Sequence, residues 1–235
     1  MLGGNILITG VGQRIGYYLA EHLQQQGYQV IGTYRTQRSS LDHLLSLGVK
    51  LIHCDFDSST QVDALIEQVK SAPEHLRGII HNASDWLPDA GAEEAIPTLQ
   101  RMMHIHVAIP YQLNLALMDR LLSSDKADII HLTDYVAEKG SKKHIAYAAS
   151  KAALENMTLS FAQLLAPKVK VNSIAPALIL FNERDDEAYK TKARAKSLMN
   201  REAGAAEMLN AVDYLLNSDY VTGRSLPVDG GRHLK

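Results

Sequence analysis

The sequence of 235 residues has one cysteine, one tryptophan and no apolar run long enough to cross a bilayer. The single cysteine excludes an internal disulfide, so nothing indicates an oxidising compartment. Cys54 lies in the apolar run 49–54, which favours a buried, unreactive thiol over a reactive one. The first ten residues lack the basic region of a signal peptide. We therefore expect a cytoplasmic protein without a membrane partner.

Neither sign of charge dominates, since 24 Lys and Arg stand against 26 Asp and Glu, a formal net charge of −2. The missing basic excess argues against a nucleic-acid partner, and the missing acidic excess argues against a solvated tail. The sequence contains no internal repeat, low-complexity tract or linker rich in proline and glycine. With 46% hydrophobic residues over this length, we expect one domain over residues 1–235.

Short apolar runs alternate with amphipathic segments along the chain. Strands are expected over residues 5–9, 29–34, 49–54, 78–81, 128–133, 170–174 and 225–228. Several runs are almost wholly apolar, which is typical of parallel strands covered on both faces. Between them, apolar residues recur at helical spacing, as in Ile15, Leu19 and Leu23. This alternation predicts an α/β fold with a doubly wound parallel sheet of about seven strands and helices on both faces.

A glycine-rich turn follows the first expected strand, with Gly10, Gly12 and Gly16 leading into a helix. Glycines at this turn let the backbone approach a pyrophosphate, which then rests at the positive end of the helix. After the second strand, an NAD site carries an acid for the ribose 2′-hydroxyl. In this sequence Arg35 and Thr36 occupy that position, and no acid does. A guanidinium matches phosphate geometry, so NADPH is favoured, with a solvated surface arginine as the alternative.

Tyr147 and Lys151 are four residues apart at the start of an expected helix, so they share one face. A nearby ammonium lowers the pKa of a phenol, and the pair can then deliver a proton near neutral pH. The spacing alone occurs often by chance. Its weight comes from the surrounding motifs.

The ordered motifs are the glycine turn, Asn82-Ala83-Ser84, Tyr147 with Lys151, residues 172–176, and Asp229-Gly230-Gly231. In this order they resemble the short-chain dehydrogenases/reductases over nearly the whole chain. The resemblance implies a Rossmann-type sheet of seven strands and a homo-oligomer, usually a tetramer.

Three departures from that family pattern are informative. Arg14 replaces the middle glycine of the turn, Asp134 replaces the usual catalytic serine, and Ser84 replaces the glycine of the Asn-Ala-Gly motif. This combination resembles the pteridine reductases, in which an aromatic residue, matched here by Trp86, stacks on the pterin. The runs 128–151, 172–182 and 221–234 resemble the dihydromonapterin reductase subfamily of bacteria. Alternatives are a helix-cap role for Asp134 and a core or loop role for Trp86.

The resemblance implies NADPH-dependent reduction of 7,8-dihydromonapterin, a dihydropteridine, to its tetrahydro form, with dihydrofolate as a further substrate. It assigns to the cofactor Gly10, Gln13, Arg14, Ile15, Gly16, Arg35, Thr36, Asp55, Phe56, Asn82, Ala83, Ser84, Tyr147, Lys151 and Pro176. It assigns Tyr147, Lys151 and Asp134 to catalysis, and Trp86, Asp134, Arg14 and Tyr147 to the substrate. Alternatives are a carbonyl (3-oxoacyl-type) reductase and a non-catalytic NADPH-sensing module.

Two further positions depart from the family. His106 stands where the family has an asparagine that helps to relay protons, and Ala177 follows Pro176 in place of glycine. His104 and His106 are two residues apart and so point to different sides of a helix, which argues against a metal site. The charged, irregular segment 178–201 follows the sixth strand, where ligands bind in doubly wound sheets. We expect a substrate lid there, with a plain surface helix as the alternative.

Overall fold

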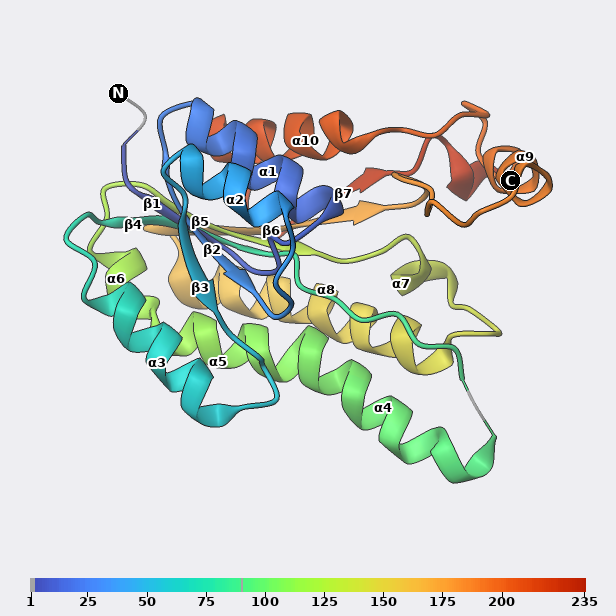
Figure 1. The fold of residues 1–235 in the computed structure, drawn as a ribbon, viewed down its shortest axis with the longest axis horizontal. Helices are drawn as coiled ribbons and strands as arrows, with labels where there is room; N and C mark the ends of the chain where they lie inside the picture. The colour runs from blue at the N-terminus through green and yellow to red at the C-terminus, as the bar shows by residue number, and fades with distance from the viewer. Residues whose placement is uncertain (1–2, 90) are drawn as a thin grey trace.

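The computed structural model describes residues 3–89 and 91–235, and seven strands of these residues form one sheet in the order β3-β2-β1-β4-β5-β6-β7 (Figure 1). The strands are β1 (Asn5–Ile8), β2 (Gln29–Tyr34), β3 (Lys50–His53), β4 (Leu76–His81), β5 (Ala127–Leu132), β6 (Val169–Pro176) and β7 (Ser225–Val228). Every neighbouring pair is parallel. The predicted sheet is therefore confirmed, and its strands differ from the expected bounds by at most two residues.

Helices cover both faces of the sheet (Figure 1). One face carries α1 (Arg14–Gln25), α2 (Ser40–Ser46) and α10 (Ala205–Asn217). The other carries α3 (Ser59–Lys70), α4 (Ala95–Met103), α5 (Ile109–Ala116), α6 (Met118–Leu122) and α8 (Ile145–Leu165). The remaining elements are α7 (Val136–Lys139), α9 (Glu187–Arg194), the short 3-10 helices η1 (Ala92–Glu94) and η3 (Arg232–Leu234), and the π-helical η2 (His104–Ala108).

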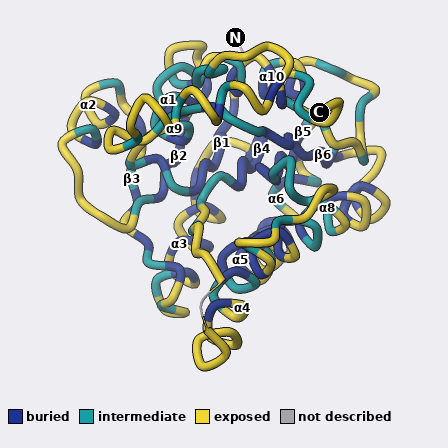
Figure 2. The backbone as a smooth tube through the Cα atoms, turned by 90° about the vertical axis from the view of Figure 1, so that its right-hand side faces the viewer, coloured by how far each residue is buried: buried dark blue, intermediate teal, exposed yellow. Residues whose placement is uncertain are grey.

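Side-chain alternation along β1 builds two separate cores. Leu7 packs with the layer of α3, α4, α5 and α8, whereas Ile6 and Ile8 pack with the layer of α1, α2 and α10. Successive residues of a strand point to opposite faces, and both faces of this strand are buried, so it is apolar throughout. Figure 2 shows the buried strands in the middle of the molecule with exposed helix surfaces around them. No helix of residues 3–89 and 91–235 is long and apolar enough to span a bilayer.

A chain of polar side chains crosses the core beneath the carboxyl ends of β4 and β5. His81 and His131 are partners across these strands. The Nε2 atom of His81 lies 2.7 Å from Asn114 Oδ1, and Asn114 Nδ2 lies 3.2 Å from His131 Nε2. His131 Nδ1 is 2.8 Å from Thr158 Oγ1. Asn114 accepts through its oxygen and donates through its amide nitrogen, so Nε2 of His81 carries a proton and Nε2 of His131 accepts one. The proton of the neutral His131 ring is then on Nδ1.

Burial of His81 makes stability depend on pH. Burial lowers its pKa from 6.5 to about 4, against the opposing bond to Asn114, and the pKa of His131 is lowered well below 6.5 by burial and by His81 and Lys151. The unfolded chain then binds more protons below pH 6.5, so stability falls as the pH falls. For His81 alone, we expect the free energy of unfolding to drop by about 2 kcal/mol between pH 7.5 and pH 5, measured by urea denaturation.

The His81→Gln variant should lose a large part of this pH slope, while His53→Gln, which changes an exposed histidine at the end of β3, should keep it. Equal slopes in the native protein and the His81→Gln variant would show that His81 is not the group that titrates.

Candidate active site

The glycine turn between β1 and α1 forms a close backbone junction with the end of β4. Gly10 has φ +76, and a Cβ there would lie 3.0 Å from the Cα atom of Ala83. A Cβ on Gly16 would lie 2.2 Å from the carbonyl oxygen of Gly10. Asn82 completes the junction, because its Nδ2 donates to the carbonyl oxygens of Thr9 and Gly10 at 3.0 and 2.9 Å. A side chain at either glycine would therefore collide with the atoms of this junction.

Arg14, in place of the middle glycine of the turn, has a positive φ angle. Its φ is +55, in the left-handed region that favours glycine. Its guanidinium donates to Leu180 O at 3.0 Å, Phe181 O at 3.3 Å and Asn182 Oδ1 at 2.8 Å. The side chain predicted to contact cofactor and substrate therefore binds the segment 178–201 in this structure.

A cavity of about 320 Å³ opens above the glycine turn. Twelve of the fifteen predicted cofactor residues line it: Gly10, Gln13, Arg14, Ile15, Gly16, Arg35, Thr36, Asp55, Phe56, Asn82, Ala83 and Ser84. Tyr147, Lys151 and Pro176 do not line this cavity. Pro176 ends β6, and its carbonyl oxygen accepts from Tyr135 N at 2.9 Å.

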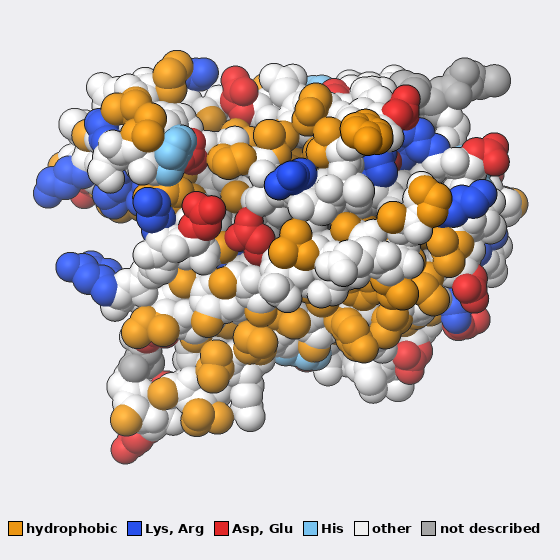
Figure 3. All heavy atoms as spheres, turned by 180° about the vertical axis from the view of Figure 1, so that it is seen from behind, with side chains coloured by type: hydrophobic (Ala, Val, Ile, Leu, Met, Phe, Trp, Pro, Cys, Tyr) orange, Lys and Arg blue, Asp and Glu red, His pale blue; other side chains and the backbone are white. Residues whose placement is uncertain are grey.

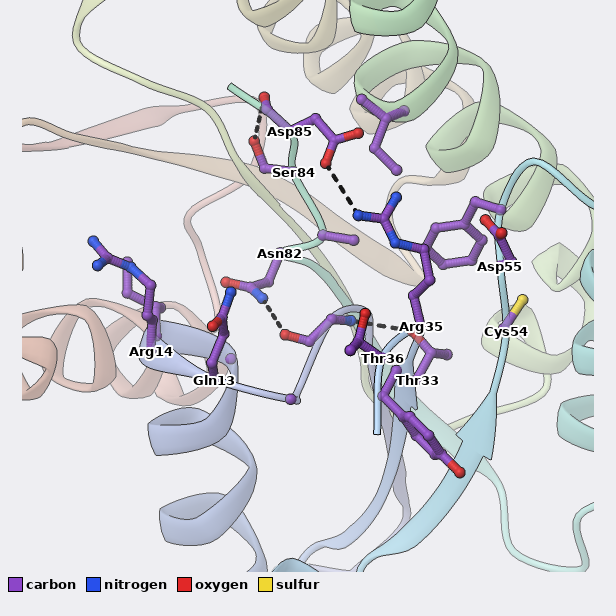
Figure 4. A pocket seen from close by; sticks show the side chains of 18 of the residues that line it. Gln13, Arg14, Thr33, Arg35, Thr36, Cys54, Asp55, Asn82, Ser84 and Asp85 are labelled. Carbon is purple, nitrogen blue, oxygen red and sulfur yellow. Dashed lines mark hydrogen bonds and ion pairs between the residues drawn. The ribbon is translucent and has the colours of Figure 1, made fainter. Parts of the chain in front are cut away.

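The cavity fits a dinucleotide that carries a 2′-phosphate. Four arginines line it: Arg14 from the glycine turn, Arg35 and Arg38 after the end of β2, where no acid stands, and Arg101 from α4. Figure 4 shows Arg35 and Thr36 on the opposite side of the cavity from Arg14, with Arg35 reaching across toward Asp85. This ion pair is long, 3.8 Å, and the Arg35 side chain is half exposed. A guanidinium held this loosely is available to a phosphate.

Sequence reasoning missed part of the wall of this cavity. Besides Gly12 of the predicted glycine turn, the additional residues are Thr33, Tyr34, Arg38, Cys54, Asp85, Arg101 and Ile105. Asp85 directly follows the Asn-Ala-Ser motif and could have been found from it. Arg101 and Ile105 come from α4 and η2, far along the chain, and no local pattern marks them. Arg101 forms ion pairs with Asp85 and Asp57.

The predicted proton-donor group comes together at the start of α8. Tyr147 OH donates to Asp134 Oδ2 at 2.9 Å, across the loop that follows β5. Lys151 Nζ donates to the carbonyl oxygen of Leu132 at 2.8 Å and lies 5.6 Å from the centroid of the Tyr147 ring. Asp134 also accepts from Val136 N at 2.9 Å, so it caps a turn as well as meeting the phenol.

The pKa of Tyr147 differs from the sequence-based expectation. The expected lowering by Lys151 is wrong for this structure, because burial and then Asp134 raise that pKa well above 10. Burial lowers the pKa of Lys151 to about 8, with Asp134 opposing. Burial also raises the pKa of Asp134, and its hydrogen bonds to Val136 and Tyr147 oppose this rise. The phenol is thus a neutral donor whose proton points at a carboxylate.

Trp86 lies outside the hydrophobic core. Its side chain is 63% exposed and stacks on the His144 ring, with centroids 4.1 Å apart and an interplanar angle of 25°. His144 immediately precedes α8, and its Nδ1 donates to the Leu87 carbonyl oxygen at 3.0 Å. A core role for Trp86 is therefore excluded, and one end of α8 is tied to the loop after β4.

The two histidines of η2 are separated as expected. His104 Nε2 lies 2.8 Å from the carbonyl oxygen of Phe56, whereas His106 is buried against Ser84 and Ser150. Within residues 3–89 and 91–235, no group of three or more His, Cys, Asp or Glu side chains has the arrangement of a metal site.

Known proteins resemble this chain along nearly its whole length. A family model described as enoyl-(acyl carrier protein) reductase matches residues 10–233. The sequence is 54% identical to a dihydromonapterin reductase of Shigella sonnei over 233 residues, covering 98% of this chain and 97% of that protein. A dihydromonapterin reductase of Klebsiella pneumoniae is 54% identical over 232 residues with the same coverage.

Solved structures agree in fold. An alternative dihydrofolate reductase of Brucella suis, determined in complex with NADP, superposes with a TM-score of 0.88 at 25% identity over 99% of this chain and 96% of that one. The corresponding protein of Brucella canis gives a TM-score of 0.90 at 24% identity, covering 99% of this chain and 94% of that one. The chain belongs to the short-chain dehydrogenase/reductase family, in the pteridine reductase branch that contains the dihydromonapterin reductases.

Proposed function

We propose that this protein is an NADPH-dependent dihydropteridine reductase that converts 7,8-dihydromonapterin to its tetrahydro form and also reduces dihydrofolate to tetrahydrofolate. The observation that carries the proposal is the bond of Asp134 Oδ2 to Tyr147 OH, in the place where other family members have serine. A carboxylate accepts hydrogen bonds only, so it suits a heterocycle rich in N–H groups better than a carbonyl oxygen. The identity of 54% with dihydromonapterin reductases supports the same substrate class.

The cofactor chemistry follows from the residues at hand. When bound, NADPH supplies a hydride to the pteridine ring. The glycine turn and Asn82 would hold the pyrophosphate end, and Arg35 with Thr36 would hold the 2′-phosphate. Lys151 and Tyr147 would face the reacting end, where Tyr147 would deliver a proton and Asp134 would hold the ring nitrogens or pass a proton toward N5.

Arg35 is expected to set the cofactor preference. The loss of one charge-assisted phosphate contact costs about 1.5–3 kcal/mol, a factor of about 10–100. We therefore expect Arg35→Asp to lose most of the preference for NADPH over NADH, measured as the ratio of kcat/KM for the two cofactors. Arg224→Asp, at an exposed position before β7, should leave the ratio unchanged. Equal use of both cofactors by the native enzyme would refute the assignment.

We infer that Trp86 covers the pterin ring on the face opposite the nicotinamide. An aromatic stack contributes about 0.5–1.5 kcal/mol beyond area burial. Trp86→Ala should therefore raise KM for the dihydropterin about two- to tenfold and change kcat less. Trp86→Phe keeps an aromatic face and should stay near the native KM. A kcat loss with unchanged KM would place Trp86 outside the substrate site.

We also propose that residues 1–235 act as one domain in which the segment 178–201 closes over the substrate as a lid. The bonds of Arg14 to Leu180, Phe181 and Asn182 support this, because they join the segment to the glycine turn beside the cofactor. Helix α9 is the regular part of this segment, and turns and irregular backbone flank it.

We infer that the protein acts in the cytoplasm as a homotetramer. Large hydrophobic side chains are exposed on three helices of one layer: Ile96 and Leu99 on α4, Tyr111 and Leu115 on α5, and Leu159 and Leu164 on α8. In Figure 3, hydrophobic side chains gather over the lower half of the molecule, the half that holds these helices in Figure 1. A second copy of the chain is the partner that this surface fits.

One substrate panel tests the proposed function against its alternatives. Purified protein is given NADPH and, in turn, 7,8-dihydromonapterin, dihydrofolate, a 3-oxoacyl thioester and simple ketones, and NADPH absorbance is followed. We expect turnover of the pterin, with slower turnover of dihydrofolate. Turnover of the thioester or ketones alone would identify a carbonyl reductase. NADPH binding with no turnover of any substrate would favour a sensing module.

A further inference from the structure

His106 is a buried histidine between the nucleotide cavity and the proton-donor helix. It lies in the π-helical segment η2, where the regular turns of α4 and α5 are interrupted, and its exposed fraction is 1%. A π-helical turn inside a helix often marks a functional site. The His106 ring meets the Tyr147 ring edge to face, with centroids 5.4 Å apart.

Both ring nitrogens of His106 are hydrogen-bonded to serines of different elements. Nε2 lies 2.7 Å from Ser84 Oγ, in the loop after β4 that lines the nucleotide cavity. Nδ1 lies 2.8 Å from Ser150 Oγ, on α8 between Tyr147 and Lys151. The imidazole therefore bridges the cofactor loop and the helix of the proton donor.

The direction of these bonds follows from the proton of Ser150. Ser150 Oγ donates to the carbonyl oxygen of Tyr147 at 2.7 Å, so toward His106 it accepts. His106 Nδ1 then carries the ring proton and Nε2 is the acceptor. Ser84 in turn donates its only hydroxyl proton to Nε2. Its other neighbour, the carbonyl oxygen of Asp85, is more distant at 3.3 Å.

The surroundings keep His106 neutral. Burial, followed by the positive charges of Lys151 and Arg101, lowers its pKa to about 2. A protonated His106 would also have to donate from both ring nitrogens. Ser150 Oγ can accept such a bond, but Ser84 points its own hydroxyl proton at Nε2 and would oppose it. The bridge thus keeps one polarity at neutral pH.

We propose that His106 is a positioning residue that holds Ser84 as a hydrogen-bond acceptor toward the bound nucleotide and fixes this loop against the helix of Tyr147 and Lys151. With its proton committed to His106, Ser84 Oγ offers only lone pairs to the cavity, which selects an N–H or O–H group of the ligand. The bridge ends on the main-chain carbonyl oxygen of Tyr147, which cannot take up a proton at neutral pH. His106 therefore does not conduct protons to solvent as the asparagine of the family is expected to do.

The first test reads the ring directly and needs no turnover. Nitrogen-15 NMR of the histidine-labelled protein distinguishes the two neutral tautomers and the cation, and the His106→Asn variant identifies the His106 signals among those of the ten histidines. We expect the neutral tautomer with its proton on Nδ1 from pH 5 to pH 9. A proton on Nε2, or a cation within this range, would overturn the proposal.

The second test compares two replacements that each keep one half of the bridge. In His106→Gln the side-chain oxygen reaches the former position of Nε2, whereas in His106→Asn the amide nitrogen reaches only that of Nδ1. His106→Asn should weaken NADPH binding roughly three- to tenfold, as expected for one lost hydrogen bond, and His106→Gln should restore most of it. His22→Gln, on the outer part of α1, is the matched control.

Coupling to Ser84 separates positioning from a general loss of packing. Ser84→Ala should weaken NADPH binding as much as His106→Asn, and the double variant should be no worse than either single variant. Additive losses would mean that the two side chains act independently. Nitrogen-15 NMR of the native protein decides the matter if the His106→Asn variant does not fold, with His106→Gln then used for assignment.

The catalytic readout depends on the proposed function and distinguishes positioning from a proton relay. The pH profile of kcat should keep its shape in both His106 variants. A lower kcat and a shifted pH limb with unchanged NADPH affinity would identify a relay and refute the positioning role. A native protein that binds NADPH without reducing pterins would refute the proposed function and leave the binding and NMR tests intact.

Discussion

Replacement of Tyr147 by phenylalanine is expected to lower kcat for dihydropterin reduction by about 10²–10⁴-fold, the usual contribution of a positioned proton donor. The variant keeps the ring that packs against His106 and loses only the hydroxyl that donates to Asp134. NADPH affinity should stay near the native value. Steady-state rates and an NADPH fluorescence titration measure the two quantities.

The control is Tyr214→Phe, which removes the hydroxyl of an exposed tyrosine on α10 and should change neither quantity. Burial and Asp134 raise the pKa of Tyr147, so the phenol keeps its proton at neutral pH and is present as a donor. Near-native turnover of Tyr147→Phe would mean that Asp134 and water deliver the proton alone.

Asp134→Ser is expected to cut kcat/KM for the dihydropterin by about 10–100-fold while leaving NADPH affinity nearly unchanged. The carboxylate accepts from the ring N–H groups, and a hydrogen bond to a charged group contributes about 1.5–3 kcal/mol. Serine restores the usual residue of the family, and its hydroxyl can donate to a carbonyl oxygen where a carboxylate cannot. The same variant should therefore gain activity toward small ketones. Both activities are measured on one preparation.

Asp134→Asn separates charge from shape in this experiment, because it keeps one acceptor oxygen and removes the negative charge. We expect a pterin rate between those of the native enzyme and Asp134→Ser. If Asp134→Ser keeps full dihydropterin turnover, Asp134 has no catalytic role and the substrate assignment loses its structural support.

The regular elements could be predicted because their signals are local. The apolar run of β5 and the glycine turn before α1 can each be recognised from a few neighbouring residues. Their order along the chain then determined the topology, since parallel connections between strands follow few rules. The bounds of β2 and β7 matched, and those of the other strands differed by one or two residues, because hydrogen-bond pairing with neighbouring strands, as of Pro176 with Val228, has no local signature.

Long-range contacts in the site could not be predicted. Arg14 was expected at the cofactor, yet its guanidinium binds residues 180–182, which are more than 160 positions away. The expected lowering of the pKa of Tyr147 failed because spacing along a helix gives neither burial nor the closer approach of Asp134. His106 was seen only as a departure from the family. Its bridge from Ser84 to Ser150 requires three elements to be placed together.

The most direct test of the account is a crystal structure of the protein with NADP⁺ and 7,8-dihydromonapterin bound together. We predict that the pterin ring lies between the nicotinamide and Trp86, with Asp134 hydrogen-bonded to ring nitrogens and Tyr147 OH within hydrogen-bond reach of the ring. The 2′-phosphate should contact Arg35. A pterin bound elsewhere, or a ring that makes no contact with Asp134 and Tyr147, would contradict the proposed dihydropteridine reductase site.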